Sequence, residues 1–247
     1  MKKIAVIPAR YASTRFPFKL MQMLGNKTVI RHTYDNTVAT GLFDEVFVVT
    51  DHKLIFDEIK SNGGKVIMSQ REHESGSDRI AEAVAEMEVD IILNVQGDEP
   101  FICRPALKAL LEVFEGTEGA VVQVASLMKP FTDTAIAANP NVVKVVVDKK
   151  MNSLLFSRSI IPHYRDQKTD NSFYEHIGVY AFRKAALTQF TNWDITPLEN
   201  AEKIECLRYL ENGVSLKMVI THETGVKIDV PQDLETAKRF LEQISSK

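Results

Sequence analysis

Three permanent cations, Arg10, Arg15 and Lys19, follow the first apolar run of the chain. That run, residues 4–7, predicts a buried strand that ends at Pro8, and the segment from Pro8 to Lys19 contains no acidic residue. In open α/β sheets, ligands bind outside the carboxyl ends of the strands, and arginine side chains match the geometry of phosphate oxygens. The pattern therefore predicts a polyphosphate site, although a solvated basic loop would have the same composition.

Two aspartates are suitably placed to hold a cation beside such a phosphate. Asp98 lies in the stretch Gly-Asp-Glu-Pro that follows the apolar run 89–95, and Asp229 lies two residues before Pro231. Taken alone, Asp98 fits an ordinary turn and Asp229 fits a helix N-cap. Magnesium is commonly bound by one or two carboxylates together with substrate phosphates. With the cationic loop, the aspartates predict Mg²⁺-dependent phosphoryl or nucleotidyl transfer.

Several classes of function are disfavoured by what the sequence lacks. No G-x-G-x-x-G follows the first strand and no G-x-x-x-x-G-K-[ST] occurs, which argues against a dinucleotide oxidoreductase and a P-loop kinase. The formal net charge of −3 gives no reason to expect nucleic-acid or membrane binding. Cys103 and Cys206 have neither disulfide-framework nor zinc-site spacing. Without a signal-peptide pattern, we expect a soluble, cytoplasmic protein.

The first half of the chain alternates apolar runs with amphipathic segments, which is typical of a mostly parallel, doubly wound α/β sheet. Ser75 followed by Asp78 has the form of a capping box and predicts the start of a helix. Strands are expected at 4–7, 46–49, 65–68, 89–95 and 120–127, and helices at 27–40, 53–61, after Ser75 and at 105–114.

The second half is predicted to carry an antiparallel insertion. Glutamates at 199, 202 and 205 are spaced by three, which usually marks a solvated helix face. We expect one domain, 1–247, with a nucleotide-binding core to about residue 130, an insertion at about 140–220 and a return to the core at about 221–247. Strands are expected at 142–147, 154–157, 177–182 and 216–220, a loop at 162–172, and helices at 197–208 and after Pro231.

The motifs together carry a resemblance to a known family. The chain resembles the 3-deoxy-D-manno-octulosonate (Kdo) cytidylyltransferases, or CMP-Kdo synthetases, in collinear order over essentially its whole length. The segments that carry the resemblance are 7–19, 50–52, 75–79, 94–100, 139–144, 156–158, 176–180 and 197–199. The resemblance implies a Rossmann-like nucleotidyltransferase fold.

The resemblance also implies an activity and roles for particular residues. The activity is transfer of CMP from CTP to Kdo with release of pyrophosphate, for lipopolysaccharide assembly, by a Mg²⁺-dependent homodimer. Asp98 and Asp229 would coordinate Mg²⁺, and Lys19 and Arg15 would act with them in catalysis. The nucleotide would be held by Pro8, Ala9, Arg10, Arg15, Lys19, Ser75, Gly76, Arg79, Gln96 and Asp98, and the sugar acid by Gln96, Arg158, His176 and Glu205.

The chain departs from the family pattern at three places. Phe18 stands where a glycine is common, Cys206 stands where a glutamine is typical, and Gly225 lies four residues before Asp229 instead of two. Because a thiol is a poor hydrogen-bond partner, the Cys206 difference bears on whether Kdo or 8-amino-Kdo is the acceptor. The alternatives are a cytidylyltransferase for 8-amino-Kdo or a sialic acid, a non-catalytic nucleotide-binding regulator, and, least favoured, an α/β oxidoreductase.

Overall fold

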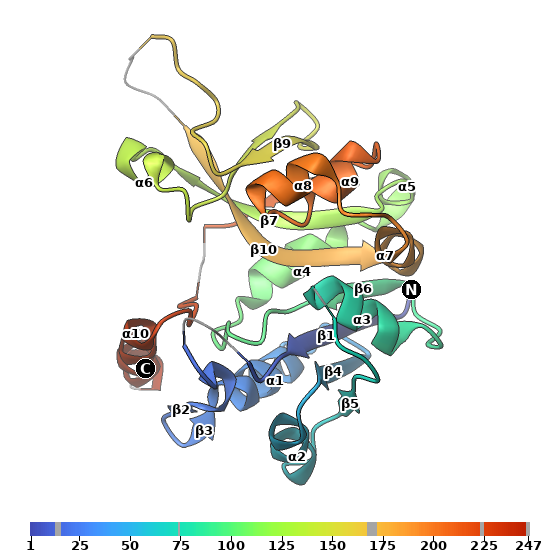
Figure 1. The fold of residues 1–247 in the computed structure, drawn as a ribbon, viewed down its shortest axis with the longest axis vertical. Coiled ribbons are helices and arrows are strands. Elements are labelled where there is room, and N and C mark those ends of the chain that lie inside the picture. Colours follow the sequence, from blue (N-terminus) through green and yellow to red (C-terminus); the bar gives the residue numbers. More distant parts are fainter. Residues whose placement is uncertain (13–15, 74, 167–171, 223–224, 246–247) are drawn as a thin grey trace. The chain divides into compact units, whose positions relative to one another are not determined.

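The computed structural model describes residues 1–12, 16–73, 75–166, 172–222 and 225–245 of the 247-residue chain. The fold consists of two compact units (Figure 1). Unit 1 comprises Met1–Arg104 and Thr224–Lys247, and unit 2 comprises Pro105–Glu223. Each unit is described by itself.

Unit 1 contains a parallel sheet in the order β6-β1-β4-β5. Its strands are apolar on both faces, as expected for a sheet covered by helices. Pro8 is tolerated in β1 because its missing N–H lies on the β6 side, beyond the last β1–β6 pair at Val6 and Asn94. The strands are β1 (Lys3–Ala9), β4 (Glu45–Thr50), β5 (Val66–Met68) and β6 (Ile91–Asn94).

The helices that connect these strands begin at polar caps. Thr28, His52 and Ser75 each accept a hydrogen bond from a backbone N–H of the first turn of α1, α2 and α3, respectively. Because parallel crossovers are right-handed, α1 and α2 cover one face of the sheet and α3 covers the other. The helices are α1 (Val29–Ala39), α2 (Lys53–Ser61), α3 (Gly76–Val84) and the C-terminal α10 (Pro231–Ser245).

Short elements lie between β1 and α1. A 3₁₀ turn, η1, carries Lys19 at its first position, and a two-stranded ribbon follows it. These elements are η1 (Lys19–Met21), β2 (Met23–Leu24) and β3 (Lys27–Thr28). The predicted helix 27–40 therefore begins two residues later than expected, because residues 27 and 28 pair with β2.

Unit 2 is built around a second group of strands in the order β11-β7-β10, with β8 pairing both β10 and β9. All of these pairs are antiparallel except β11 with β7. The turn between β8 and β9 is closed by Asp148, which accepts hydrogen bonds from the backbone N–H groups of Lys150 and Asn152. The strands are β7 (Val124–Phe131), β8 (Lys144–Val147), β9 (Ser153–Ser157), β10 (Phe173–Arg183) and β11 (Lys217–Ile220).

The helices of unit 2 are mostly short. They are α4 (Arg104–Glu112, whose first residue belongs to unit 1), α5 (Gly116–Gly119), α6 (Thr134–Ala138), α7 (Lys184–Thr191), α8 (Pro197–Glu202) and α9 (Leu207–Glu211). The predicted strand 120–127 begins later, at Val124, because the turn of α5 continues to Val122. Helices α5, α6 and α7 were not predicted.

The single helix predicted at 197–208 is wrong. The chain forms two helices, α8 and α9, because Lys203 adopts a left-handed backbone conformation with φ of 52° and ends α8. The prediction that the three glutamates form a solvated face is also wrong for Glu199. That side chain is buried, and both of its carboxylate oxygens accept hydrogen bonds from Arg208, at 2.6 and 2.7 Å.

The predicted fold class is confirmed. Parallel strands alternate with helices in the first half of the chain, and antiparallel pairs dominate the second half. The predicted loop at 162–172 lies partly outside the described residues. Among the helices that the structure describes, none combines the length and the apolar character needed to cross a membrane.

Candidate active site

Lys19, Asp98 and Asp229 form a cluster of opposite charges in unit 1. The Lys19 ammonium donates one hydrogen bond to Asp98 Oδ2 and a second, of 3.1 Å, to Asp229 Oδ1. The three side chains are largely shielded from solvent, with 15%, 12% and 29% of their areas exposed. The structure thus brings together the lysine and both aspartates predicted to act on a polyphosphate and its metal.

Asp98 is placed by the tight turn that follows β6. Gly97 passes so close to β1 that an added Cβ would lie 3.1 Å from the Pro8 carbonyl oxygen. The Gly97 carbonyl accepts a hydrogen bond from Thr33 on α1, which fixes the turn against the helix. The stretch is therefore more than an ordinary turn, because the small residue allows a carboxylate to lie at the carboxyl ends of β1 and β6.

Asp229 is held by the start of the last helix, where Asp233 bonds the backbone. The carboxylate of Asp233 accepts hydrogen bonds from the backbone N–H groups of Asp229 and Val230, at 2.8 and 2.9 Å. The Ile228 N–H also donates to the Asp98 carbonyl oxygen, which joins the two acidic segments. The Asp229 carboxylate therefore faces Lys19 and, at 3.7 Å, Lys227.

The Asp98 carboxylate lies in a buried environment beside a second acidic side chain. Its second oxygen, Oδ1, is buried and has no hydrogen-bond partner among the described residues. The neighbouring Glu99 has its pKa raised to about 7, first by burial and then by the negative charge of Asp98. Gln96, predicted to contact both substrates, is half-buried in the same turn and donates to Asn94 Oδ1 at 3.3 Å.

The loop after β1 contains the other predicted phosphate ligands. Pro8 and Ala9 form the end of the strand, and Arg10 is exposed beside them. Arg15 lies outside the described residues. Among the predicted nucleotide ligands, Arg79 is buried, and its guanidinium donates to the Ala9 carbonyl oxygen at 2.9 Å and to Asp51 Oδ2 at 2.6 Å. These two hydrogen bonds fix the end of β1.

The two other nucleotide-binding residues predicted from the Ser75 motif lie at the start of α3. Ser75 caps the helix, accepting from the Asp78 N–H at 3.1 Å and donating to the Asp78 carboxylate at 2.8 Å, which confirms the predicted cap. Gly76 lies against the ring of Pro8, where a Cβ added to the glycine would be 3.3 Å from Pro8 Cγ. The first turn of α3 is therefore next to the carboxyl end of β1.

An aromatic stack supports the cationic loop. The ring of Tyr11 lies parallel to that of His52, with 3.7 Å between the ring centroids, and 4.5 Å from the ring of Phe18. Phe18 has a left-handed backbone with φ of 56°, which explains why glycine would suit this position. The aromatic contact offsets the conformational cost of a bulky residue there.

Arg158, predicted to bind the sugar carboxylate, lies just past β9 in unit 2. Its guanidinium donates to the carbonyl oxygens of Glu202, Pro140 and Lys203, at 2.7, 2.8 and 3.4 Å. A guanidinium has five N–H groups, so these contacts leave donors for a ligand. The simpler interpretation of this arginine is a salt bridge at the end of a strand. Within the described residues, its guanidinium instead contacts backbone oxygens.

His176 is half-buried in unit 2. Its Nε2 lies 3.0 Å from Ser126 Oγ, and its ring contacts Phe156 and Tyr180. Burial lowers the pKa of His176 to about 3, so the ring is neutral at pH 7. It can therefore accept or donate one hydrogen bond, but it cannot supply positive charge to a carboxylate.

Glu205 and Cys206 lie in the break between α8 and α9. Glu205 is half-buried, and Cys206 is buried with its thiol hydrogen-bonded to the Tyr180 side chain. Burial raises the pKa of the Cys206 thiol well above its usual range. Cys206, which stands where the family typically has glutamine, is thus an unreactive side chain packed against Tyr180. Sequence reasoning did not select that tyrosine.

Sequence reasoning also missed Lys144 and Glu202. Lys144 is fully buried, and its ammonium donates to three carbonyl oxygens. Glu202 accepts hydrogen bonds from Ser157 Oγ and from the Arg158 N–H. A lysine inside the apolar run 142–147 was a visible signal for the first residue. Nothing local in the sequence distinguishes Glu202 from a solvated glutamate.

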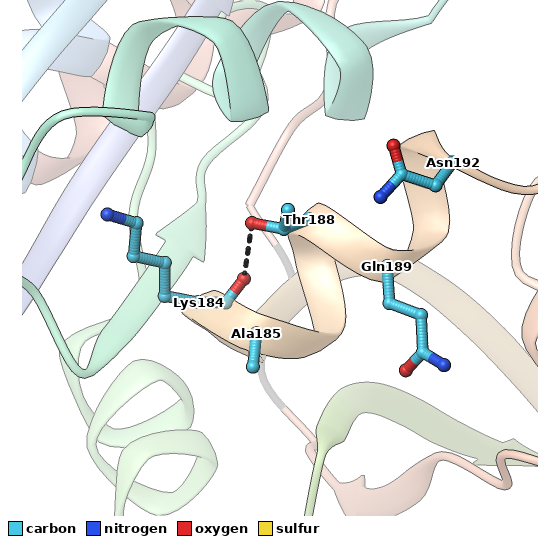
Figure 2. Close-up of a pocket in the computed structure, with 5 residues that line it drawn as sticks. All are labelled: Lys184, Ala185, Thr188, Gln189 and Asn192. Carbon is cyan, nitrogen blue, oxygen red and sulfur yellow. Dashed lines mark hydrogen bonds between the residues drawn. The ribbon is translucent and has the colours of Figure 1, made fainter.

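A shallow pocket elsewhere in unit 2 offers little chemistry. It is lined by residues of α7 and its C-cap, namely Lys184, Ala185, Thr188, Gln189 and Asn192. Figure 2 shows that these side chains point in different directions from the helix and do not converge on one point. Thr188 already donates to the Lys184 carbonyl oxygen, at 3.1 Å. The charged clusters described above are therefore better candidates for a catalytic site.

The geometry agrees with the comparisons with known proteins. A family model described as cytidylyltransferase matches residues 4–241. A 3-deoxy-manno-octulosonate cytidylyltransferase of Flavobacterium johnsoniae is 57% identical over 99% of this chain and 100% of its own. The enzyme of that name from Christiangramia forsetii is 54% identical over 96% of each chain.

The solved structures give the same result. The chain is similar to a CMP:2-keto-3-deoxy-manno-octonic acid synthetase complexed with CTP, with a TM-score of 0.93, 34% identity, and coverage of 99% of this chain and 100% of that one. A 4-diphosphocytidyl-2C-methyl-D-erythritol synthase from Anaerococcus prevotii shares the fold alone, with a TM-score of 0.64 at 15% identity over 98% of each chain. The chain belongs to the 3-deoxy-manno-octulosonate cytidylyltransferase family.

Proposed function

We propose that this chain transfers CMP from CTP to Kdo, releasing pyrophosphate and activating the sugar acid for lipopolysaccharide synthesis. The observation that carries the proposal is the Lys19–Asp98–Asp229 cluster at the carboxyl ends of parallel strands in a cytidylyltransferase. It combines a cation for the triphosphate with two carboxylates for a metal, which is what nucleotidyl transfer requires.

The residues present fit a magnesium ion. The buried Asp98 Oδ1 has no hydrogen-bond partner among the described residues, and the Asp229 carboxylate accepts a hydrogen bond from the same Lys19 ammonium that bonds Asp98. No cluster of three or more His, Cys, Asp or Glu side chains suited to a metal occurs in the described parts of the chain. The protein would thus provide two carboxylates and the triphosphate the remaining oxygens, which is typical of Mg²⁺.

The chemistry follows from these side chains. The anomeric oxygen of Kdo forms a bond to the α-phosphorus, the bond from that phosphorus to the oxygen bridging to the β-phosphate breaks, and the hydroxyl proton passes to solvent. Asp98 and Asp229 would hold Mg²⁺, which would neutralise charge on the phosphates and favour the deprotonated hydroxyl. Lys19, with Arg10 and Arg15 from the same loop, would stabilise the departing pyrophosphate.

Recognition of the two substrates is assigned to two sets of residues that share Gln96. We assign the cytidine to the loop and helix start formed by Pro8, Ala9, Ser75 and Gly76, which Arg79 holds in place. Gln96 is assigned to both substrates, while Arg158 would form a bidentate pair with the sugar carboxylate. His176, neutral at pH 7, and Glu205 would contact sugar hydroxyl groups.

The proposal is tested by pyrophosphate release from CTP and Mg²⁺ with Kdo, 8-amino-Kdo and N-acetylneuraminate supplied separately. We expect turnover with Kdo and at least a roughly 100-fold loss in Asp98→Asn, because that change removes a metal ligand and one negative charge. Asp57→Asn on α2 is the matched control, since Asp57 is exposed and pairs with Lys53. Retention of activity in Asp98→Asn would contradict the metal assignment.

A second acceptor is favoured by one specific feature. Cys206 lies buried against Tyr180 where the family typically has glutamine, so its side chain offers a weaker hydrogen bond to the sugar. Turnover with 8-amino-Kdo alone would keep the mechanism and change the acceptor. Binding of CTP without turnover of any acceptor would favour a non-catalytic regulator.

We also propose that the chain acts as a homodimer in the cytoplasm. The family resemblance supports the dimer, and the use of CTP, which cells hold in the cytoplasm, supports the location. Light scattering coupled to size-exclusion chromatography tests the first statement, because a dimer has twice the 27.8 kDa mass of the chain. Cell fractionation tests the second.

A further inference from the structure

The position of Arg158 is determined by two side chains outside the predicted site, Lys144 and Glu202. Lys144 opens β8, opposite Ser157 in the β8–β9 ladder. Glu202 ends α8, far along the chain from Arg158. Both are charged residues of unit 2 that make several contacts with the segment around Arg158.

Lys144 acts on the backbone around Arg158. Its side chain is fully buried, and its ammonium donates to the carbonyl oxygens of Asn139, Val142 and Arg158 itself, the first two at 3.2 and 2.7 Å. Between Asn139 and Val142 lies Pro140, whose carbonyl oxygen accepts from Arg158 Nη1. Lys144 thus fixes both the backbone of Arg158 and the turn that holds one arm of its guanidinium.

Glu202 acts on the opposite side of the same residue. Its carboxylate accepts from the Arg158 N–H at 2.9 Å and from Ser157 Oγ at 2.6 Å, while its carbonyl oxygen accepts from Arg158 Nε at 2.7 Å. The left-handed conformation of Lys203 directs the next carbonyl oxygen toward Nη2, at 3.4 Å. The backbone N–H, the backbone carbonyl and the guanidinium of Arg158 are therefore all held by two segments.

A lysine side chain exposed to solvent would not form the arrangement seen at Lys144. A buried ammonium loses its hydration, and that loss is compensated only where all of its donors find acceptors. Here the three N–H groups of Lys144 are matched by three carbonyl oxygens. Two N–H groups of the Arg158 guanidinium make no hydrogen bond within the described parts of the chain. A guanidinium held in this way is suited to bind a carboxylate in a single orientation, because little side-chain freedom remains to be lost on binding.

We infer that Lys144 and Glu202 are positioning residues that set the orientation of Arg158 for the carboxylate of the acceptor sugar. The inference rests on the proposed function, which assigns that carboxylate to Arg158. Lys144 and Glu202 act through Arg158 and need not touch the substrate themselves. Their loss should weaken recognition of the sugar acid and leave recognition of CTP unchanged.

The experiment is a double-mutant cycle on steady-state kinetics. Glu202→Gln and Arg158→Ala are made singly and together, and KM is measured separately for Kdo and for CTP. We expect each single variant to raise the KM for Kdo about 10-fold or more, with the KM for CTP within about twofold of wild type. In the double variant, Glu202→Gln should add less than a further twofold, because Arg158 is no longer present to be positioned.

Matched variants keep the test independent of stability. Lys144→Met is expected to follow the same pattern, but it removes a donor from three carbonyl oxygens, of which that of Asn139 also accepts from the Val142 N–H, and this loss costs stability. Ser157→Ala removes the hydroxyl that donates to Glu202 and accepts from the Ser159 N–H, and it should produce a smaller change of the same kind. Lys149→Met, an exposed lysine in the β8–β9 turn, is the control with the same charge change and should match wild type. Thermal unfolding is recorded for every variant.

The outcomes separate the two proposals. If Arg158→Ala leaves the KM for Kdo unchanged, the proposed role of Arg158 fails. If Arg158→Ala raises that KM while Glu202→Gln multiplies it by the same factor in both backgrounds, Glu202 acts independently and the positioning role is refuted. A parallel rise in the KM for CTP would also refute it, because a general structural defect would affect both substrates.

Discussion

Replacing Lys19 with methionine should increase the affinity of the nucleotide-free protein for a divalent cation about 30-fold. In the structure, the Lys19 ammonium donates to both Asp98 and Asp229, so an incoming cation must break two charge-assisted hydrogen bonds. Each such bond contributes about 1 kcal/mol when partly screened by solvent, and a total of about 2 kcal/mol corresponds to a roughly 30-fold change in Kd. Methionine has a similar length and no charge, so it preserves the packing of η1.

The assay is titration with Mn²⁺, with the free ion followed by electron paramagnetic resonance. Lys53→Met is the matched control, because it removes the same charge from an exposed helix of unit 1. The double variant Lys19→Met with Asp98→Asn should lose the gain, which would place the ion at the predicted carboxylates. Mn²⁺ should also raise the Tm of Lys19→Met more than that of wild type, since it relieves repulsion between the two aspartates.

The reasoning is refuted if Lys19→Met binds Mn²⁺ no more tightly than wild type. The ammonium would then not compete with the metal, and Asp98 and Asp229 would not be its ligands in the absence of nucleotide. If the prediction holds, Lys19 has two roles in sequence. It neutralises the aspartates before CTP binds, and it turns to the phosphates once the metal has taken its place.

Three further predictions concern stability. Phe18→Ala should lower the free energy of unfolding by about 1 kcal/mol, because it loses the stack on Tyr11 and keeps the left-handed backbone, whereas Phe18→Gly should be close to neutral in urea titrations. His176 has its pKa lowered by burial to about 3, below the unfolded value of about 6.5, so its contribution is present above pH 6.5 and falls as the pH drops. Denaturant titrations should show up to about 2 kcal/mol of this loss by pH 5 and a flatter profile in His176→Gln. Glu199→Ala should cost about 3 kcal/mol, because it leaves the buried Arg208 guanidinium without its carboxylate, and a loss below about 1 kcal/mol would contradict the importance of that pair.

The parts of the fold that were predictable from the sequence depend on local signals. The Ser75 cap and the proline that opens the last helix act within one helical turn, and the structure confirms both elements. The helix predicted at 197–208 failed for the opposite reason. The helix ends at the left-handed Lys203, and Glu199 and Glu202 before it bond Arg208 and the Ser157–Arg158 segment. A periodic pattern of glutamates carries no information on these partners.

In the candidate site, too, some residues were predicted from local sequence signals, and the roles of others are shown only by the fold. Lys19, Asp98 and Asp229 were found because each follows a strand end or precedes a helix, and the structure joins them although Lys19 is separated from the aspartates by 79 and 210 residues. The role of Arg79 was not predictable, because only the fold shows that its guanidinium is committed to Ala9 and Asp51. Its assignment to the nucleotide stays a prediction.

Both units use one physical device, a charged side chain that holds segments distant in the sequence. Lys19 joins two acidic segments in unit 1, and Lys144 and Glu202 join two loops around Arg158 in unit 2. Removing such a lysine breaks the hydrogen bonds that join these segments, so the change affects stability as well as function. Loss of activity alone is therefore weak evidence for a catalytic role in this chain. Two measurements distinguish a loss of function from a loss of stability. They are the metal affinity of the Lys19 variant and the separate KM values for Kdo and CTP of the Glu202 variant. A general loss of stability would change neither of these selectively.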